Sequence, residues 1–214
     1  MRDGATPSFD PLPRKIRGNF IFANYGADQA VDNDDGSSYF HVLRNLFYDA
    51  SGFKMDYGGH DSLFEENLVM AMGRKKCIGF GSFKEGHGDI VQNNTCIVGL
   101  QKIQDDATNS ADGNYMRDPT KKRLWSDHED NVASLERCEG SNAILRTNKY
   151  YTPHGNASFT CSYAGGGEIS LEEVQTKYGL DLGSTTDIIP PVHILLYWAR
   201  QLLFLEEADS ASWV

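Results

Sequence analysis

Short apolar runs, each opened by an asparagine, recur along the first half of the chain. They are Asn19-Phe20-Ile21-Phe22, Asn45-Leu46-Phe47-Tyr48, Asn67-Leu68-Val69-Met70 and Asn94-Thr95-Cys96-Ile97-Val98. The asparagines are separated by 26, 22 and 27 residues (45 − 19, 67 − 45 and 94 − 67). A period of roughly 20–50 residues indicates a solenoid, a propeller or an array. Because the units are rich in β-branched, aromatic and turn-forming residues, each predicts short strands joined by turns.

The length of one repeat decides between these architectures. It is too short for a propeller blade, which needs about 40 residues or more, and it suits one coil of a parallel β-helix. We therefore predict an all-β fold, a right-handed parallel β-helix (a β-solenoid), with a C-terminal helical cap. Equivalent positions in successive coils lie about 4.8 Å apart, so the asparagines can pass amide hydrogen bonds along a ladder. The alternative is a loop-rich β-protein with four unrelated Asn-apolar pairs.

The rest of the chain divides into three parts. We predict an irregular segment at 1–13, β-helix coils over 14–168 with a long loop at about 104–134, and the helical cap over 169–214. Ser141-Asn142-Ala143-Ile144-Leu145 resembles a return to the Asn pattern after the loop. Ser170-Leu171-Glu172-Glu173 is a capping box that predicts a short helix ending at Gly179. A second, largely apolar helix is predicted from Pro190-Pro191 to Leu205, where it would cover the last coil.

Composition and charge limit the class of protein. The chain of 214 residues is 40% hydrophobic and has no long apolar stretch, as expected for one domain with a sizeable core. A net charge of −10 argues against nucleic acid as a partner, because neutralising phosphates needs a basic face. The second predicted helix is too short and too polar for a membrane span. We expect a monomer.

The cysteines and two sequons favour an extracellular or secreted protein. Cys77, Cys96, Cys138 and Cys161 permit two disulfides in three pairings, and Cys77 and Cys96 are expected within one coil of each other. Asn93-Asn94-Thr95 and Asn156-Ala157-Ser158 are glycosylation sequons. No signal peptide opens the chain, so we expect the N-terminus to be truncated.

Two histidines share one place in the repeat. His60 lies seven residues before Asn67, and His87 lies seven residues before Asn94. If the asparagines stack, the histidines stack too. Asn33-Asp34-Asp35-Gly36 also aligns with Met55-Asp56-Tyr57-Gly58, which places Asp34 and Asp56 one coil apart. The candidate catalytic residues are therefore His60, His87, Asp56, Asp61, Tyr57 and Lys54, with a histidine or Lys54 as base and Tyr57 as acid. In the alternative interpretation, the His-Asp pairs only close the turns.

Carboxylates and basic residues complete the candidate chemistry. Asp32, Asp34 and Asp35 can bind Ca²⁺ in a loop that is not an EF-hand, or they can form an Asp-rich turn that accepts backbone N–H groups. Nearby carboxylates need a neutralising cation or a proton. The candidate substrate-binding residues are Asp35, Arg74, Lys75, Lys76 and Asp89.

The segment Ser170-x4-Gln175-x3-Gly179-x-Asp181-x2-Ser184 is similar to one found after the coils in right-handed parallel β-helix proteins of the pectate-lyase-like superfamily. The resemblance covers roughly residues 14–190. Asp34-Asp35 with Gly86-His87-Gly88 matches polygalacturonase-like hydrolases only in part, and Tyr57-Gly58-Gly59-His60-Asp61 is similar to, but shorter than, a uronan epimerase motif. The resemblance implies a cleft for an extended polysaccharide and a lyase, epimerase or hydrolase acting on a uronic-acid-containing glycan. The alternative is a non-catalytic, glycan-binding or adhesin-like β-solenoid that binds through exposed aromatic residues.

Overall fold

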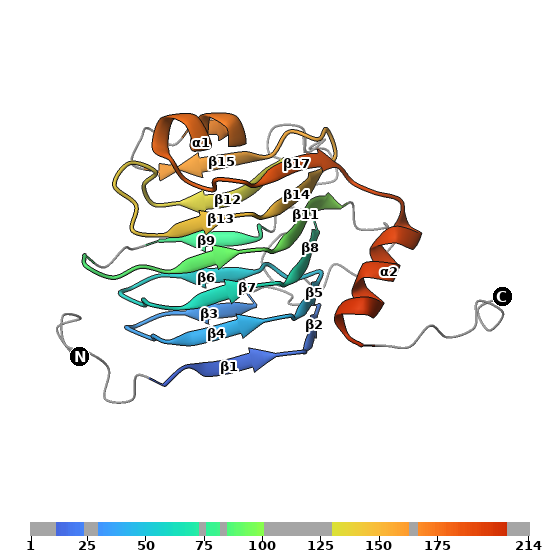
Figure 1. Cartoon of the computed structure of the whole chain (residues 1–214), viewed down its shortest axis with the longest axis horizontal. Coiled ribbons are helices and arrows are strands. Elements are labelled where there is room, and N and C mark those ends of the chain that lie inside the picture. The colour runs from blue at the N-terminus through green and yellow to red at the C-terminus, as the bar shows by residue number, and fades with distance from the viewer. Residues whose placement is uncertain are drawn as a thin grey trace, which may run out of the picture.

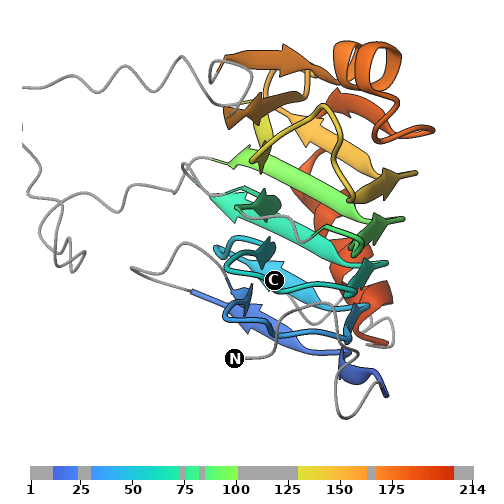
Figure 2. The same ribbon diagram turned by 90° about the vertical axis from the view of Figure 1, so that its left-hand side faces the viewer.

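The computed structural model describes residues 12–23, 30–72, 76–81, 85–100, 130–162 and 167–204, whose strands form three sheets (Figures 1 and 2). The first sheet contains β1 (Arg14–Arg17), β4 (Phe40–Leu43), β7 (Leu63–Glu65), β10 (Ile90–Gln92) and β13 (Ile144–Arg146). The second contains β2 (Phe20–Phe22), β5 (Leu46–Tyr48), β8 (Leu68–Met72), β11 (Thr95–Leu100), β14 (Lys149–Thr152) and β17 (Thr185–Ile188). The third contains β3 (Val31–Asn33), β6 (Phe53–Met55), β9 (Ile78–Phe80), β12 (Asn131–Leu135), β15 (Ser158–Cys161) and β16 (Glu168–Ser170).

Three consecutive strands place one strand in each sheet, and we call such a set a lap. Each strand from β1 to β12 pairs in parallel with the strand three positions later in the chain. β17 also joins its sheet in parallel, whereas β16 pairs antiparallel with β15. The mostly β chain with stacked parallel sheets is compatible with the predicted parallel β-helix.

Side chains from all three sheets meet in one buried cluster. In the first sheet, Val42, Phe64 and Val91 occupy the same register on successive laps and are fully buried. Phe47 of the second sheet and Phe53 of the third sheet contact Phe64, with ring centroids 5.7 and 5.3 Å away. Stacking the laps therefore buries apolar surface in every lap, which is the main favourable contribution to folding.

The predicted asparagine ladder is confirmed. Asn19 donates through its side-chain amide to Asn45 Oδ1 at 2.9 Å, Asn45 to Asn67 at 3.0 Å and Asn67 to Asn94 at 3.1 Å. The same Oδ1 atoms also accept the backbone N–H of the preceding asparagine. Each ladder residue follows a residue with positive φ, among them Arg44 and Glu66 (both 52°), so a left-handed residue turns the chain from the first sheet into the second.

The fifth member of the ladder differs from the sequence prediction. Asn94 donates to Asn148 Oδ1 at 3.0 Å, whereas Asn142, the expected return to the pattern, has an exposed side chain. The apolar residues after Asn142 form β13 of the first sheet, not a strand of the second. The ladder ends at the buried Asp181, which accepts from Asn148 at 3.0 Å and from the Tyr150 hydroxyl at 2.7 Å.

The motif that carried the family resemblance has a structural role at this end of the ladder. Ser170 caps α1 (Leu171–Tyr178) by accepting the backbone N–H of Glu173, and Gly179 ends the helix with φ 65°, as predicted. Gln175 donates to the backbone carbonyls of Asp181 and Ser184 at 2.9 and 3.0 Å. The motif thus fixes the segment that closes the ladder.

The second helix, α2 (Val192–Leu202), is shorter than predicted and lies elsewhere. It packs on the outer face of the second sheet, alongside the stack (Figure 1), and does not cover the last lap. Leu195 and Trp198 lie in this contact, against side chains that include Leu68 and Ile97. The segment predicted as a helical cap also contains β17. β12 begins at Asn131, so the end of the predicted loop is strand, and residues 104–129 lie outside the described part of the chain.

Two disulfides lie within the buried cluster. Cys77 bonds to Cys96 and Cys138 to Cys161, with Cα atoms 6.1 and 5.6 Å apart. The expectation that Cys77 and Cys96 lie close together is confirmed. Paired cysteines indicate an extracellular or otherwise oxidising environment.

Candidate functional site

The histidines lie in a turn that recurs between the third and the first sheet. Asn33 pairs with Met55 in the β3–β6 register, so Asp34 and Asp56 start equivalent turns, as the sequence alignment predicted. Further on, Ser38 forms a parallel bridge with His60. Each equivalent position therefore stacks on the next lap, and His60 and His87 come from the turns before β7 and β10.

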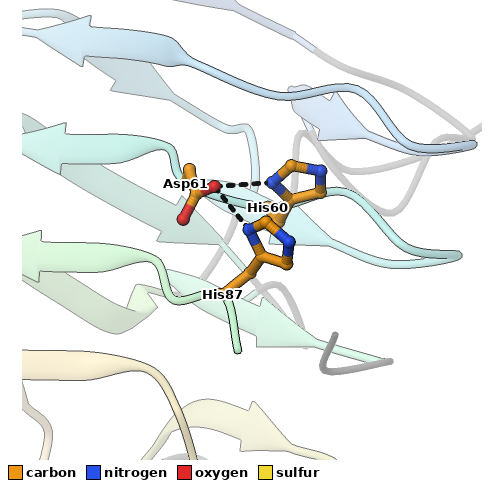
Figure 3. Close-up of side chains that lie close together, drawn as sticks. All are labelled: His60, Asp61 and His87. Carbon is orange, nitrogen blue, oxygen red and sulfur yellow. Dashed lines mark hydrogen bonds and ion pairs between the residues drawn. The ribbon is translucent and has the colours of Figure 1, made fainter. Parts of the chain in front are cut away.

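The two imidazoles share one carboxylate oxygen (Figure 3). Nδ1 of His60 lies 2.8 Å from Asp61 Oδ2, and Nδ1 of His87 lies 2.7 Å from the same atom. The ring centroids are 4.1 Å apart with an interplanar angle of 38°. The prediction that these histidines pair across neighbouring laps is confirmed, and of the two aspartates expected beside them, Asp61 or Asp56, it is Asp61 that bonds to both rings.

Asp61 is held from both sides. Its φ is 54°, a left-handed conformation that aspartate tolerates better than most residues. Burial would raise the pKa of Asp61, but hydrogen bonds from His87, His60 and the Gly88 amide outweigh burial and lower the pKa. Asp61 is therefore an anion at neutral pH, and both ring Nδ1 atoms are oriented to donate to it.

Asp89 supplies a second carboxyl group beside the histidines. It is 3% exposed, and its Oδ1 accepts the Ser62 backbone N–H at 2.8 Å. Burial raises the pKa of Asp89 to about 7, against the lowering effect of the Ser62 hydrogen bond; Asp61 raises the pKa further and His87 lowers it. Tyr39 packs edge-on against His60, with the ring centroids 6.0 Å apart.

Gly59 allows the backbone at His60 to lie close to the preceding lap. A Cβ at Gly59 would lie 2.6 Å from the Asn33 carbonyl oxygen and 3.1 Å from that of Ser37. Any larger residue would push this turn away from the lap below. The close approach brings the His60 backbone N–H to Ser37 O at 3.1 Å, so the ring has a fixed origin.

Lys54 neutralises two of the three aspartates that were assigned to Ca²⁺, Asp32 and Asp34. Its Nζ lies 3.1 Å from Asp32, 3.3 Å from Asp34 and 3.7 Å from Asp56. Burial would lower the pKa of Lys54, but hydrogen bonds and charge from Asp32 and Asp34 outweigh burial and raise it. A lysine with a raised pKa is a poor base, so the arrangement favours Lys54 as a counter-ion. Ca²⁺ binding at Asp32, Asp34 and Asp35 stays a prediction.

The remaining candidate residues are dispersed. Asp35 is exposed in the turn with φ 51°, and Tyr57 is 67% exposed, 5.7 Å from the Lys54 ammonium. Lys76 is half-buried; burial lowers its pKa and the Glu168 carboxylate partly offsets that effect. Arg74 and Lys75 lie outside the described residues.

Three residues of the site were not predicted from the sequence. Ser62 holds Asp89, Tyr39 contacts His60, and the Gly88 amide binds Asp61 Oδ1 at 3.3 Å. The repeat could have predicted Tyr39 and Gly88. Ser38, His60 and His87 occupy equivalent positions in successive laps, so the residues that follow them, Tyr39, Asp61 and Gly88, also stack.

Comparison of the chain with protein-family models, with curated proteins and with solved structures gave no match. None of the described helices has the length and apolar character needed to cross a bilayer.

Proposed function

We propose that this protein is a right-handed parallel β-helix that acts on an extracellular, uronic-acid-containing polysaccharide by acid–base chemistry at His60 and His87. The observation that carries the proposal is the pair of imidazoles bound to a single carboxylate oxygen. Both rings point Nδ1 at Asp61, which leaves the two Nε2 atoms as the sites of proton exchange. No described residue makes a hydrogen bond to either Nε2 atom.

Charge balance gives the two rings different roles. One Asp61 carboxylate compensates one imidazolium, and two charged rings with centroids 4.1 Å apart repel each other. The proposed reaction therefore uses one ring as neutral imidazole and the other as imidazolium. The neutral ring is a base, and the charged ring is an acid.

A base and an acid on neighbouring laps suit chemistry next to a uronate carboxylate. The base removes the proton on the carbon that bears the carboxylate, and the electron pair forms a double bond as the bond to the glycosidic oxygen breaks. The acid gives its proton to that leaving oxygen. If the proton returns to the opposite face of the carbon instead, the outcome is epimerisation. In both reactions the two rings supply the proton transfers, which positioned side chains accelerate by about 10²–10⁴-fold.

The test is turnover of a panel of polyuronates and neutral glycans by the full chain, following unsaturated products and reducing ends. We expect a polyuronate to be converted, and His60→Ala and His87→Ala each to lower the rate at least about 100-fold. His154→Ala is the matched control, because His154 also bonds through Nδ1 to an aspartate, Asp130, at 2.9 Å but on an exposed surface. Histidine variants that keep the wild-type rate would refute the assignment.

Non-catalytic glycan binding is the second candidate, favoured by the 67% exposed ring of Tyr57. An exposed aromatic ring offers an apolar face on which a sugar can stack. This candidate predicts binding without turnover, weakened by Tyr57→Ala and unaffected by His87→Ala. The same glycan panel, followed by calorimetry, separates the two functions.

A further inference from the structure

The donor atoms of His60, Asp61 and His87 converge as metal ligands do. One ligand atom from each residue can be chosen so that all lie within 4.8 Å of one another, and this is the only such group of three or more in the described part of the chain. Asp61 Oδ2 lies 2.8 Å from His60 Nδ1 and 2.7 Å from His87 Nδ1. We propose that these three residues also bind one divalent transition metal ion of the Zn²⁺ type, and that the bound ion stops proton transfer at the two rings.

The donor spacing is close to that of a coordinated set. Zn²⁺ binds imidazole nitrogen and carboxylate oxygen at about 2.0–2.2 Å, which places neighbouring ligands roughly 3.0–3.5 Å apart. The two N···O separations need to widen by about half an ångström to admit an ion. Asp61 is 29% and His87 is 16% exposed through their side chains, so solvent can reach the site and complete the coordination.

The donor types select the class of metal. Imidazole nitrogens favour Zn²⁺, Ni²⁺, Cu²⁺ and Fe²⁺, whereas Ca²⁺ and Mg²⁺ prefer oxygen donors. Two of the three donors here are imidazoles. The oxygen-rich turn of Asp32 and Asp34, by contrast, already holds the Lys54 ammonium. The transition metal is therefore expected at the histidines and not at the aspartate turn.

The lap register makes the site rigid before an ion arrives. The His60 backbone N–H is bonded to Ser37 O, and Asp61 Oδ1 accepts the Gly88 amide from the next lap. Tyr39 packs edge-on against the His60 ring. Ligands fixed by such outer contacts lose little freedom on binding, and changing outer contacts typically costs 10–100-fold in metal affinity.

A bound ion has a direct consequence for the proposed chemistry, and this part of the inference rests on the proposed function. An ion on Nδ1 displaces the Nδ1 protons, so each neutral, metal-bound ring carries its one proton on Nε2. That Nε2 has no lone pair with which to accept a proton, and a neutral ring is a much weaker acid than an imidazolium. The metal-bound protein is then unable to use either ring as acid or base. Zn²⁺ acts as a reversible inhibitor of the same site.

Metal binding is tested on the full chain without any glycan. The protein is treated with a chelator, dialysed and titrated with ZnCl₂ by calorimetry, with CaCl₂ as competitor. We expect one Zn²⁺ per chain, undiminished by equal Ca²⁺, and an affinity at least about tenfold weaker in His60→Ala, His87→Ala and Asp61→Asn. Asp61→Asn guards against misfolding, because asparagine tolerates the positive φ of 54°. His154→Ala should bind Zn²⁺ as the wild type does.

The outcomes separate the two proposals. The absence of a binding heat, or unchanged affinity in the histidine variants, would overturn the metal site whatever the glycan assays show. If a polyuronate is converted, saturating Zn²⁺ should reduce its turnover at least about tenfold and excess chelator should restore the rate. Turnover that is unaffected by saturating Zn²⁺ would overturn the inhibition while leaving the acid–base function in place.

Discussion

Replacing Asn148 with alanine tests the ladder where sequence and structure disagree about its course. The asparagine pattern in the sequence selects Asn142 for the fifth lap, whereas the structure places Asn148 there. The Asn148 side chain, which is 1% exposed, accepts from the Asn94 backbone and side chain and donates to Val91 O and Asp181 Oδ1. The substitution removes these four hydrogen bonds and leaves two buried donors of Asn94 without an acceptor.

The expected loss follows from those two donors. A buried donor without a partner costs about 1–3 kcal/mol, so Asn148→Ala should lower the free energy of unfolding by roughly 2–6 kcal/mol. A domain is typically stable by only about 5–15 kcal/mol, so the effect is large. Asn142→Ala, at an exposed residue, should lower the free energy of unfolding by much less, because water can replace a lost partner at an exposed group.

The assay is urea unfolding followed by circular dichroism, with the disulfides intact. The midpoint should fall for Asn148→Ala, while the slope stays that of the wild type, because the same surface is exposed on unfolding. Equal midpoints for the two variants, or a lower midpoint for Asn142→Ala, would refute the ladder register in this lap.

Two further variants test other parts of the structure. Lys54→Met should destabilise the protein at pH 7; because the pKa of Lys54 is raised above its ordinary value of 10.5, the difference from wild type should persist up to that pH and disappear as the pH rises through the folded-state pKa. Thermal unfolding across pH 7–11 measures this, and a difference that vanishes well below pH 10 would contradict the ion cluster. Removing the Cys138–Cys161 bridge with a double alanine variant should cost about 3 kcal/mol in urea unfolding, since the closed loop spans 23 residues. An unchanged midpoint would show that the bridge does not form.

The repeat could be predicted from the sequence because, at the same corner of each lap, buried polar groups need hydrogen-bond partners. A residue with positive φ followed by a buried asparagine supplies these partners, and this pair recurs at Asn45, Asn67 and Asn94. Asn148 escaped because Asn142 also precedes an apolar run, and 54 residues separate Asn148 from Asn94. The distinguishing property is which sheet the following strand joins, and that depends on pairing between distant strands.

For the candidate site, too, the sequence predicted which laps meet but not the individual contacts. The ladder register was enough to bring His60 and His87 together, because equivalent positions stack. The choice of Asp61 Oδ2 as the shared acceptor depends on a turn with φ 54°, which spacing does not encode. Lys54 was interpreted as a base for a related reason: its reach to Asp32 depends on a cross-strand contact and a long side chain's rotamer. The apolar character of α2 predicted that it packs, but not on which surface.

The ladder also has an electrical direction. Every ladder asparagine donates toward the C-terminal lap, and those from Asn45 to Asn148 accept from the N-terminal side, so the amide dipoles align as they do in an α-helix. The positive end of this stack meets Asp181, a side chain that accepts hydrogen bonds but, when ionised, has none to give. Asparagine thus relays the polarity of the stack from lap to lap, and aspartate terminates it. In the strand register the corner that follows Asn148 is occupied by Ser184, whose hydroxyl accepts the Asn148 backbone N–H at 2.7 Å and donates to Asp181, so both routes out of the last asparagine end on one carboxylate.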